Sequence, residues 1–265
     1  MTVNTLPIWW DGPADGPTNM AADECLAAEA IARGGPVVRL YGWTRTTVSL
    51  GAFQRVADAR AELSIAGAAL VRRPSGGGAI VHGSDVTYAA AVPKHHPLGG
   101  HPQAFYTAFH AALVETLAEL GVVARMWPAA APAGRGGADS FFCFDRRADG
   151  DVVAARPGRG PADDDPKILG SAQRRLAAAV VQHGSLLVRG AEGVGRAARH
   201  PSLAELRSQG AVGDERDLVE RWLERVAGGL GGVVAWQAGS FAGSRAADVA
   251  RRVAPPRGTN AAGLV

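Results

Sequence analysis

Residues Val71–Gly83 read VRRPSGGGAIVHG, and the three consecutive glycines at their centre limit the folds that are possible. An apolar, strand-like segment stands on each side of them. No Gly-Lys-Ser/Thr closes the stretch, so it is not a phosphate-binding P-loop. The glycines lie between two strands and not before a long helix, which also excludes a Rossmann fingerprint. Backbone without side chains lets a ligand lie flat on N–H groups, but it also suits a tight hairpin with positive φ. Spacing alone favours neither reading.

The patterning on either side of the glycines predicts an α+β fold, a mixed sheet flanked by helices. Two long helices are expected, one over residues 19–33 with Asn19 as its N-cap and one over 102–120. Shorter helices are expected over 201–208, 214–230 and 244–253. Period-2 or continuous apolar runs predict the strands, which we expect to share one sheet: 36–43, 46–53, 69–74, 79–83, 86–93, 122–127, 151–155, 167–175, 177–188 and 232–237.

Composition narrows the class of protein further. Of 265 residues, 47% are hydrophobic, enough for a sizeable core, yet no run of about 18 apolar residues predicts a membrane span. Two cysteines make no disulfide framework, so a cytoplasmic location is expected. The net charge is only +3 and the arginines are scattered, so no nucleic-acid partner is expected. His95, His96 and His101 lack a metal-binding motif, and no metal is expected.

Lysine is rare in this chain. Of the 28 basic residues only two are lysines, Lys94 and Lys167, and the rest are arginines. Because arginine stays protonated in proteins while lysine responds to its surroundings, each remaining lysine is a candidate for a specific role. Lys94 lies in a loop-like stretch, whereas Lys167 directly precedes the segment ILGSAQ.

Several ordered motifs together resemble the lipoate-protein ligase and octanoyltransferase superfamily, which also includes biotin-protein ligases. They are NMAADE, PVVRLYGWTRTTVSLGAFQ, RRPSGGGAIVH, KILGSAQRR and VVQHGSLLV, spread over about residues 5–190. The segment CFD resembles the cysteine-dependent octanoyltransferases of bacilli. The resemblance implies a catalytic domain of the biotin/lipoate ligase type over residues 1–190. It leaves 191–265 as a small helical extension packed on the same domain, with about the last ten residues frayed.

The resemblance also implies roles for individual residues. Cys143 is expected to be the nucleophile and Lys167 its activator. A substrate pocket is expected from Arg73, Ser75, Gly76, Gly77, Gly78, Ala79, His82, Gly170, Ser171, Ala172, Gln173, His183 and Gly184. Local sequence alone leaves other readings open: an inert core cysteine, a surface lysine, an Arg73 that anchors a carboxylate and a structural His82. His183 is expected to orient the loop.

The function implied is octanoyl transfer in lipoate biosynthesis, from acyl carrier protein through a Cys143 thioester to a lysine of a lipoyl domain, such as glycine-cleavage H protein. No cofactor is expected, since thioester exchange needs no ATP, and the enzyme is expected to be a monomer. Three alternatives remain: transfer of octanoyl or lipoyl groups between lipoyl domains, ATP-dependent lipoate ligation, and non-catalytic binding of acyl carriers.

Three departures from the family pattern affect these expectations. The loop reads GGGA, as in ligases. Gly83 stands where the family carries aspartate, and Asp85 is a possible substitute. The segment between Cys143 and Lys167 carries the insertion GRGPADDDP, and its aspartates would raise the pKa of Lys167 if they folded close to it. We expect residues 146–166 to form a mobile, partly exposed loop with one possible strand at 151–155.

Overall fold

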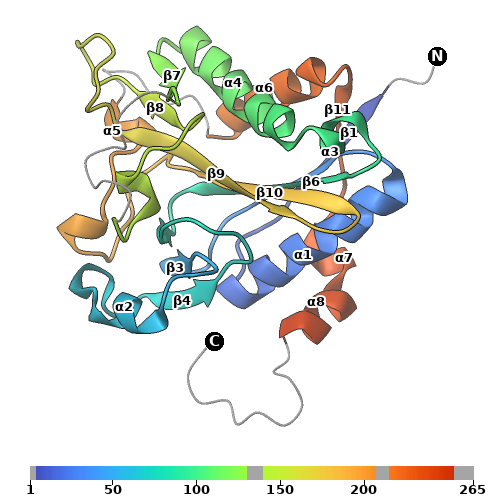
Figure 1. The fold of residues 1–265 in the computed structure, drawn as a ribbon, viewed down its shortest axis with the longest axis horizontal. Helices are drawn as coiled ribbons and strands as arrows, with labels where there is room; N and C mark the ends of the chain where they lie inside the picture. The colour runs from blue at the N-terminus through green and yellow to red at the C-terminus, as the bar shows by residue number, and fades with distance from the viewer. Residues whose placement is uncertain (1–3, 130–139, 207–214, 254–265) are drawn as a thin grey trace.

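The structure, a computed structural model, describes residues 4–129, 140–206 and 215–253. Its centre is a mixed sheet with the strand order β11-β1-β2-β6-β10-β9-β8-β7 (Figure 1). β1 runs parallel to both of its neighbours, and the other pairs are antiparallel. The expected α+β class is therefore confirmed. The strands are β1 (Thr5–Trp10), β2 (Val37–Tyr41), β6 (Val86–Pro93), β7 (Ala124–Met126), β8 (Val152–Ala154), β9 (Lys167–Arg175), β10 (Ala179–Leu186) and β11 (Val233–Trp236).

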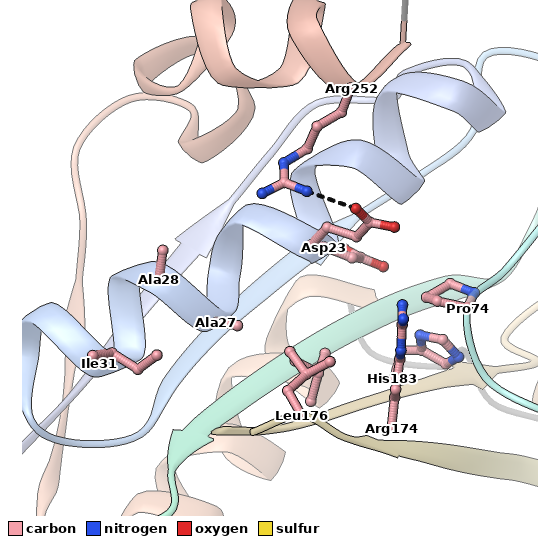
Figure 2. A pocket seen from close by; sticks show the side chains of 11 residues that line it. Asp23, Ala27, Ala28, Ile31, Pro74, Arg174, Leu176, His183 and Arg252 are labelled. Atoms are coloured by element: carbon pink, nitrogen blue, oxygen red, sulfur yellow. Dashed lines mark hydrogen bonds and ion pairs between the residues drawn. The ribbon is translucent and has the colours of Figure 1, made fainter. Parts of the chain in front are cut away.

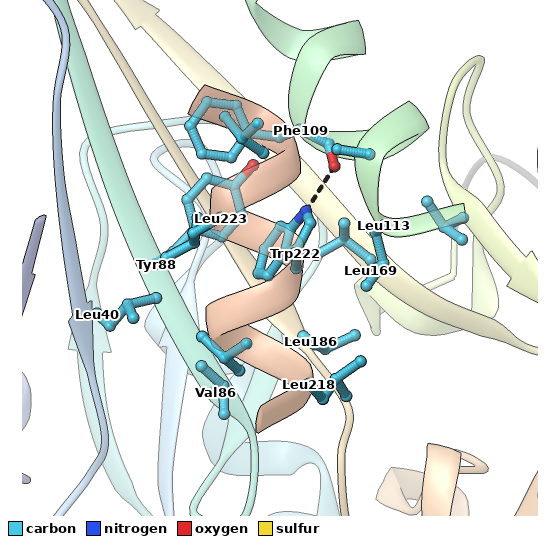
Figure 3. Packing of buried hydrophobic residues seen from close by; sticks show 14 of the residues in the cluster. Leu40, Val86, Tyr88, Phe109, Leu113, Leu169, Leu186, Leu218, Trp222 and Leu223 are labelled. Atoms are coloured by element: carbon cyan, nitrogen blue, oxygen red, sulfur yellow. Dashed lines mark hydrogen bonds between the residues drawn. The ribbon is translucent and has the colours of Figure 1, made fainter. Parts of the chain in front are cut away.

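Helices cover both faces of this sheet (Figure 1). One face is covered by α4 (Pro102–Glu119) and α6 (Glu215–Gly229), and the other by α1 (Gly16–Arg33). Trp222 of α6 is fully buried, and its Nε1 donates to the Phe109 carbonyl of α4 at 2.8 Å (Figure 3). The Tyr88 ring of β6 stacks on Phe109 with centroids 4.9 Å apart. These aromatic rings tie the two helices to the middle of the sheet.

α1 begins earlier than the sequence predicts. Asp15 is the N-cap, and its Oδ1 accepts from the Thr18 N–H at 2.9 Å. The expectation that Asn19 caps the helix is wrong, because Asn19 lies inside the first turn. Its Nδ2 donates to the Gly42 carbonyl at 3.0 Å, which ties α1 to the end of β2. Pro17 suits an early helical position, where its missing N–H leaves no intrahelical bond unmade.

The glycine-rich loop belongs to a second, smaller sheet. Its strand order is β4 (Ala69–Arg72), β3 (Thr47–Leu50), β5 (Ile80–His82), so β3 separates the two strands that the glycines join. The expected single sheet is therefore wrong, and the loop is not a hairpin turn. Because β4 and β5 do not pair, the glycines cross over one end of β3. Short helices α2 (Val56–Ala61), α3 (Pro97–Gly100) and α5 (Leu203–Leu206) complete the connections.

The C-terminal part of the described chain returns to the main sheet. β11 lies beside β1, with Thr5 and Val233 as register partners. After it, α7 (Phe241–Ser244) and α8 (Ala246–Val253) pack near α1. The expected fraying of the last ten residues falls outside the described residues, as does the end of the helix predicted over 201–208. No helix within the described ranges combines the length and the apolarity needed to cross a membrane.

Candidate active site

Gly78 lets the glycine-rich loop lie directly against the segment that carries Cys143. A Cβ at Gly78 would stand 2.7 Å from the Cys143 nitrogen, which no larger residue could accommodate without a shift. The Ala79 N–H donates to the Phe141 carbonyl, and the Cys143 N–H donates to the Ala79 carbonyl, each at 2.8 Å. Cys143 then opens a single 3₁₀ turn, Cys143–Asp145. The loop thus fixes the backbone position of the candidate nucleophile.

Arg73 holds the glycine-rich loop in shape from beneath. Its guanidinium donates to the carbonyls of Ser49 at 2.7 Å, Gly76 at 2.9 Å and Gly78 at 2.7 Å. The possibility that Arg73 anchors a carboxylate is wrong, because these partners are backbone carbonyls. Burial lowers the pKa of Arg73, although the group remains a cation at neutral pH. Gly77, at φ +99°, adopts the left-handed conformation that suits glycine.

The structure brings Cys143 and Lys167 together. Lys167, the first residue of β9, places its Nζ 3.5 Å from the Cys143 Sγ and 3.4 Å from the Cys143 carbonyl oxygen. Its side chain is only 4% exposed. Gly170 makes room for it, since a Cβ there would lie 2.3 Å from the Lys167 Cε. Lys167 is thus a buried cation in contact with the candidate nucleophile.

Asp151, which the sequence did not suggest, completes this cluster. Its Oδ2 lies 2.8 Å from the Lys167 Nζ, and its side chain is 2% exposed. Burial opposes the positive charge of Lys167, but Cys143 and Asp151 together raise its pKa above the ordinary value. Two aspartates of the insertion, which would raise this pKa if they folded close to Lys167, pair with arginines instead. Asp165 pairs with Arg125 at 3.3 Å, and Asp164 pairs with Arg159 at 3.2 Å.

Asp151→Asn is expected to destabilise the fold by about 3 kcal/mol, because it leaves the buried Lys167 charge without its carboxylate. Urea unfolding of the variant and the wild type measures the difference. Asp164→Asn is the matched control, since its ion pair with Arg159 is partly exposed and contributes less than about 1 kcal/mol. Equal, small losses in the two variants would show that the buried pair contributes no special stability.

Two buried histidines hold the glycine-rich loop and the neighbouring strands. Ser75 and His183 are hydrogen-bonded through the Ser75 Oγ and the His183 Nε2, which links the loop to β10. Burial, with Arg73 nearby, lowers the pKa of His183 to about 3, so its ring is neutral at pH 7. His82 lies between the Ser49 hydroxyl and the Asp85 carboxylate, with 2.8 Å to each. Asp85 thus supplies the carboxylate beside His82 that Gly83, which has no side chain, cannot provide.

Ser171, Gln173 and Gly184 lie on the opposite face of the sheet from the loop. The Ser171 Oγ is 2.7 Å from both the Tyr88 hydroxyl and the His110 Nε2, on the side covered by α4. A Cβ at Gly184 would stand 2.3 Å from this same Oγ. Gln173 donates to the Pro102 carbonyl at the start of α4, at 2.7 Å. Because side chains alternate along a strand, only Gly170 and Ala172 of the GSAQ motif face the loop.

His110 of α4 is a site residue that the sequence reading missed. Its Nδ1 donates to the Gly150 carbonyl at 2.7 Å, and burial lowers its pKa to about 3. The neutral ring therefore accepts at Nε2 from Ser171, which in turn accepts from Tyr88. Gly150 directly precedes Asp151, so this chain of hydrogen bonds supports the carboxylate beside Lys167. A histidine among the apolar residues of a predicted helix was the available signal.

A cavity of about 350 Å³ lies between α1 and the sheet, beyond His183 (Figure 2). Ala27, Ala28 and Ile31 of α1 face it from one side. Leu176 and Val181 line it from the sheet, and Pro74 joins it to the glycine-rich loop. His183, which is hydrogen-bonded to Ser75 of the loop, also lines this cavity, called here the apolar cavity, and its remaining lining residues are charged: Asp23, Glu24, Arg174 and Arg252.

Residues 15–212 match the lipoyl protein ligase A/B catalytic domain, and this range contains the loop, Cys143, Asp151 and Lys167. The chain belongs to this family. Octanoyltransferase LipM of Kyrpidia tusciae is 35% identical over 196 residues, which cover 70% of this chain and 67% of the relative. Octanoyltransferase LipM of Carboxydothermus hydrogenoformans is 34% identical over 179 residues, 66% of this chain and 61% of the relative. The matches thus span about two thirds of the relatives' length.

Solved structures support the fold of the lipoyl protein ligase family. The bipartite lipoate protein ligase of Thermoplasma acidophilum, studied with its E2 lipoyl domain, superposes with a TM-score of 0.64. The match covers 94% of this chain and 92% of that one, at 16% identity. Lipoate-protein ligase A bound with ATP gives the same TM-score and identity, covering 94% of each chain. The expected fold of the biotin/lipoate ligase type is confirmed.

The segment between Cys143 and Lys167 is more ordered in this member of the lipoyl protein ligase family than its composition predicts. β8 is fully buried, and Asp165 is 2% exposed. The expected partial exposure of residues 146–166 is found at 148–149, 157–161 and 163, whereas 150–155 and 165–166 are buried. β8 gains its burial from pairing with both β7 and β9, which the local sequence could not reveal.

Cys25 and the loop histidines were the other candidates in the sequence, and the structure places them in structural roles. Cys25 is 5% exposed and packs in the apolar core between α1 and the sheet, away from Cys143. Of the loop histidines, His96 caps α3 by accepting from the Leu98 N–H at 3.3 Å. In the parts of the chain described, no group of three or more His, Cys, Asp or Glu side chains is arranged to hold a metal ion.

Proposed function

We propose that this chain is a cysteine-dependent octanoyltransferase of lipoate biosynthesis. The Cys143 Sγ forms a bond to the carbonyl carbon of an octanoyl thioester, and the bond from that carbon to the donor sulfur breaks. The proton of Cys143 ends on the departing donor thiol. A lysine amine of a lipoyl domain then forms the amide, while the Cys143 thiol is released with a proton from the amine. Both steps balance without ATP.

The observation that carries this proposal is the 3.5 Å contact between the Nζ of the buried Lys167 and the Sγ of the partly buried Cys143. A cation there stabilises negative charge on the attacking sulfur and then on the departing donor sulfur. The octanoyltransferase names of the relatives support the same reaction. The donor is proposed to be acyl carrier protein, the acceptor a lipoyl domain such as glycine-cleavage H protein, and the enzyme a monomer.

The octanoyl chain is proposed to run from Cys143 toward the apolar cavity. Gly170 faces Lys167, and Ala172 follows two residues later on the same face of β9. Ala172 is the register partner of His183, which lines the cavity. Gly170 and Ala172 carry little or no side chain, so this face of β9 leaves space for a narrow apolar chain between Cys143 and the cavity.

The decisive experiment is to incubate the protein with octanoyl carrier protein, without ATP, and measure its intact mass. An octanoyl adduct on Cys143, lost on adding a lipoyl domain that becomes octanoylated, is the expected result. A requirement for ATP would indicate a ligase. Acylation only by an octanoylated or lipoylated lipoyl domain would indicate transfer between such domains. Binding of the carrier without any transfer would indicate a non-catalytic protein.

Ala172→Leu is expected to slow octanoylation of Cys143 at least tenfold, because the longer side chain fills the proposed path of the acyl chain. The reaction of Cys143 with iodoacetamide, which needs no acyl space, should stay within twofold of the wild type. Acetyl and octanoyl thioesters of the same small thiol provide the comparison. If both donors slow equally, the substitution disturbs the thiol and not the acyl path.

A further inference from the structure

We propose that a second cavity, on the other side of Lys167, binds the phosphate-bearing pantetheine arm of the thioester donor. This inference rests on the proposed function. The cavity, called here the arginine cavity, measures about 150 Å³. Its lining is rich in basic side chains: Phe144, Asp145, Arg147, Arg156, Asp164, Pro166, Lys167, Arg199, His200 and Pro201.

The position of the arginine cavity matches the geometry of a thioester. It shares Lys167 with the catalytic cluster, and Phe144 directly follows Cys143. The Lys167 Nζ lies 5.4 Å from the centre of the Phe144 ring. No residue lines both this cavity and the apolar cavity. A thioester carbonyl carries an alkyl chain on one side and the donor sulfur on the other, so an attacking thiol needs two separate spaces around it.

The charges of the arginine cavity favour an anion. Four of the lining side chains are cations and two are carboxylates. Burial lowers the pKa of His200, and Lys167 lowers it too, whereas Asp145 raises it. His200 therefore adds no full charge at neutral pH. Asp145 lies 3.5 Å from the His200 ring, and Asp164 pairs with Arg159. Arg147 donates to the Asp165 carbonyl, which leaves Arg156 and Arg199 as the groups proposed to meet a phosphate.

The size of the arginine cavity selects the kind of ligand. About 150 Å³ is less than the roughly 300 Å³ at which drug-sized pockets begin, so it fits a slender chain segment. Guanidinium groups bind phosphate oxygens in a bidentate manner, which suits the phosphate at the far end of a pantetheine arm. Arg156 lies just before the insertion GRGPADDDP, and Asp164 and Pro166 belong to it. The insertion therefore builds one wall of a donor site.

Two small donors that differ only in the phosphate test this inference: octanoyl-pantetheine and octanoyl-4′-phosphopantetheine. The rate of Cys143 octanoylation is followed by intact mass. For the wild type we expect the phosphorylated donor to react at least tenfold faster at low donor concentration. The double variant Arg156→Gln/Arg199→Gln should lose this preference, while its rate with octanoyl-pantetheine stays within twofold of the wild type.

The matched control is Arg175→Gln/Arg196→Gln, which removes two exposed arginines that do not line the cavity and should keep the preference. A wild type that reacts equally with both donors would overturn the inference, as would a double variant that keeps the preference. If the double variant slowed only the transfer from acylated Cys143 to the lipoyl domain, the cavity would belong to the acceptor site. That result would also overturn the inference. Absence of any adduct with either donor would instead refute the proposed function.

Discussion

Cys143→Ala is expected to abolish octanoyl transfer, with no adduct detectable by intact mass, because it removes the atom that accepts the acyl group. The fold should remain, since Cys143 is only partly buried and its N–H donates a backbone hydrogen bond to the Ala79 carbonyl that alanine keeps. Thermal unfolding measures the fold, and the transfer assay measures the chemistry.

Cys25→Ala is the matched control for this prediction. Cys25 packs in the core under α1 and has no contact with the loop, so its variant should keep full transfer. Some loss of stability is expected there, because a buried sulfur leaves a small void. Transfer by Cys143→Ala at the wild-type rate would rule out the covalent mechanism, even if the chain proved to be a transferase by another route.

Lys167→Arg is expected to slow transfer at least tenfold, equivalent to about 1.4 kcal/mol of transition-state stabilisation. The cluster has no space for a planar guanidinium, since the Lys167 side chain already fills the gap that Gly170 leaves. Lys94→Arg is the control, because Lys94 is the other lysine of the chain and is exposed.

The two half-reactions separate the roles of Lys167. If it mainly favours the thiolate, Lys167→Arg should preserve alkylation of Cys143 by iodoacetamide while slowing aminolysis of the octanoyl-enzyme. If alkylation and aminolysis both slow, positioning is the larger contribution. If neither changes, Lys167 is only a cation near the site, and its rarity in the sequence has no functional meaning.

The sequence predicted those elements whose signals are local. Strands such as β6 and β10 are long, apolar runs, and α4 ends near Gly121 as its pattern requires. The proximity of Cys143 and Lys167 followed from ordered motifs that resemble a family, not from spacing. The start of α1 was missed because Asn19, a good capping residue in isolation, is used to bind β2 instead.

Features that depend on distant pairing could not be predicted. Asp151 meets Lys167 because β8 and β9 pair with a register shift at Val152/Val153, which no local pattern encodes. The aspartates next to Lys167 in the chain were more conspicuous, yet they turn away toward arginines. Likewise, Ser171 and Gly170 are neighbours in one motif, but strand alternation sends them to opposite faces of the sheet. His110 is hydrogen-bonded to Ser171 on the face that α4 covers.

The pairing of β11 with β1 sets the order in which the sheet can be completed during synthesis. β1 leaves the ribosome well before its outer partner, which starts at Val233. Until then β1 is an edge strand with unpaired backbone groups, which in a growing chain invite association with other strands. A nascent chain paused before β11 would therefore already contain Cys143 and Lys167 but would carry an open sheet edge. The demand for chaperones at this edge should thus last until residue 236 has cleared the exit tunnel.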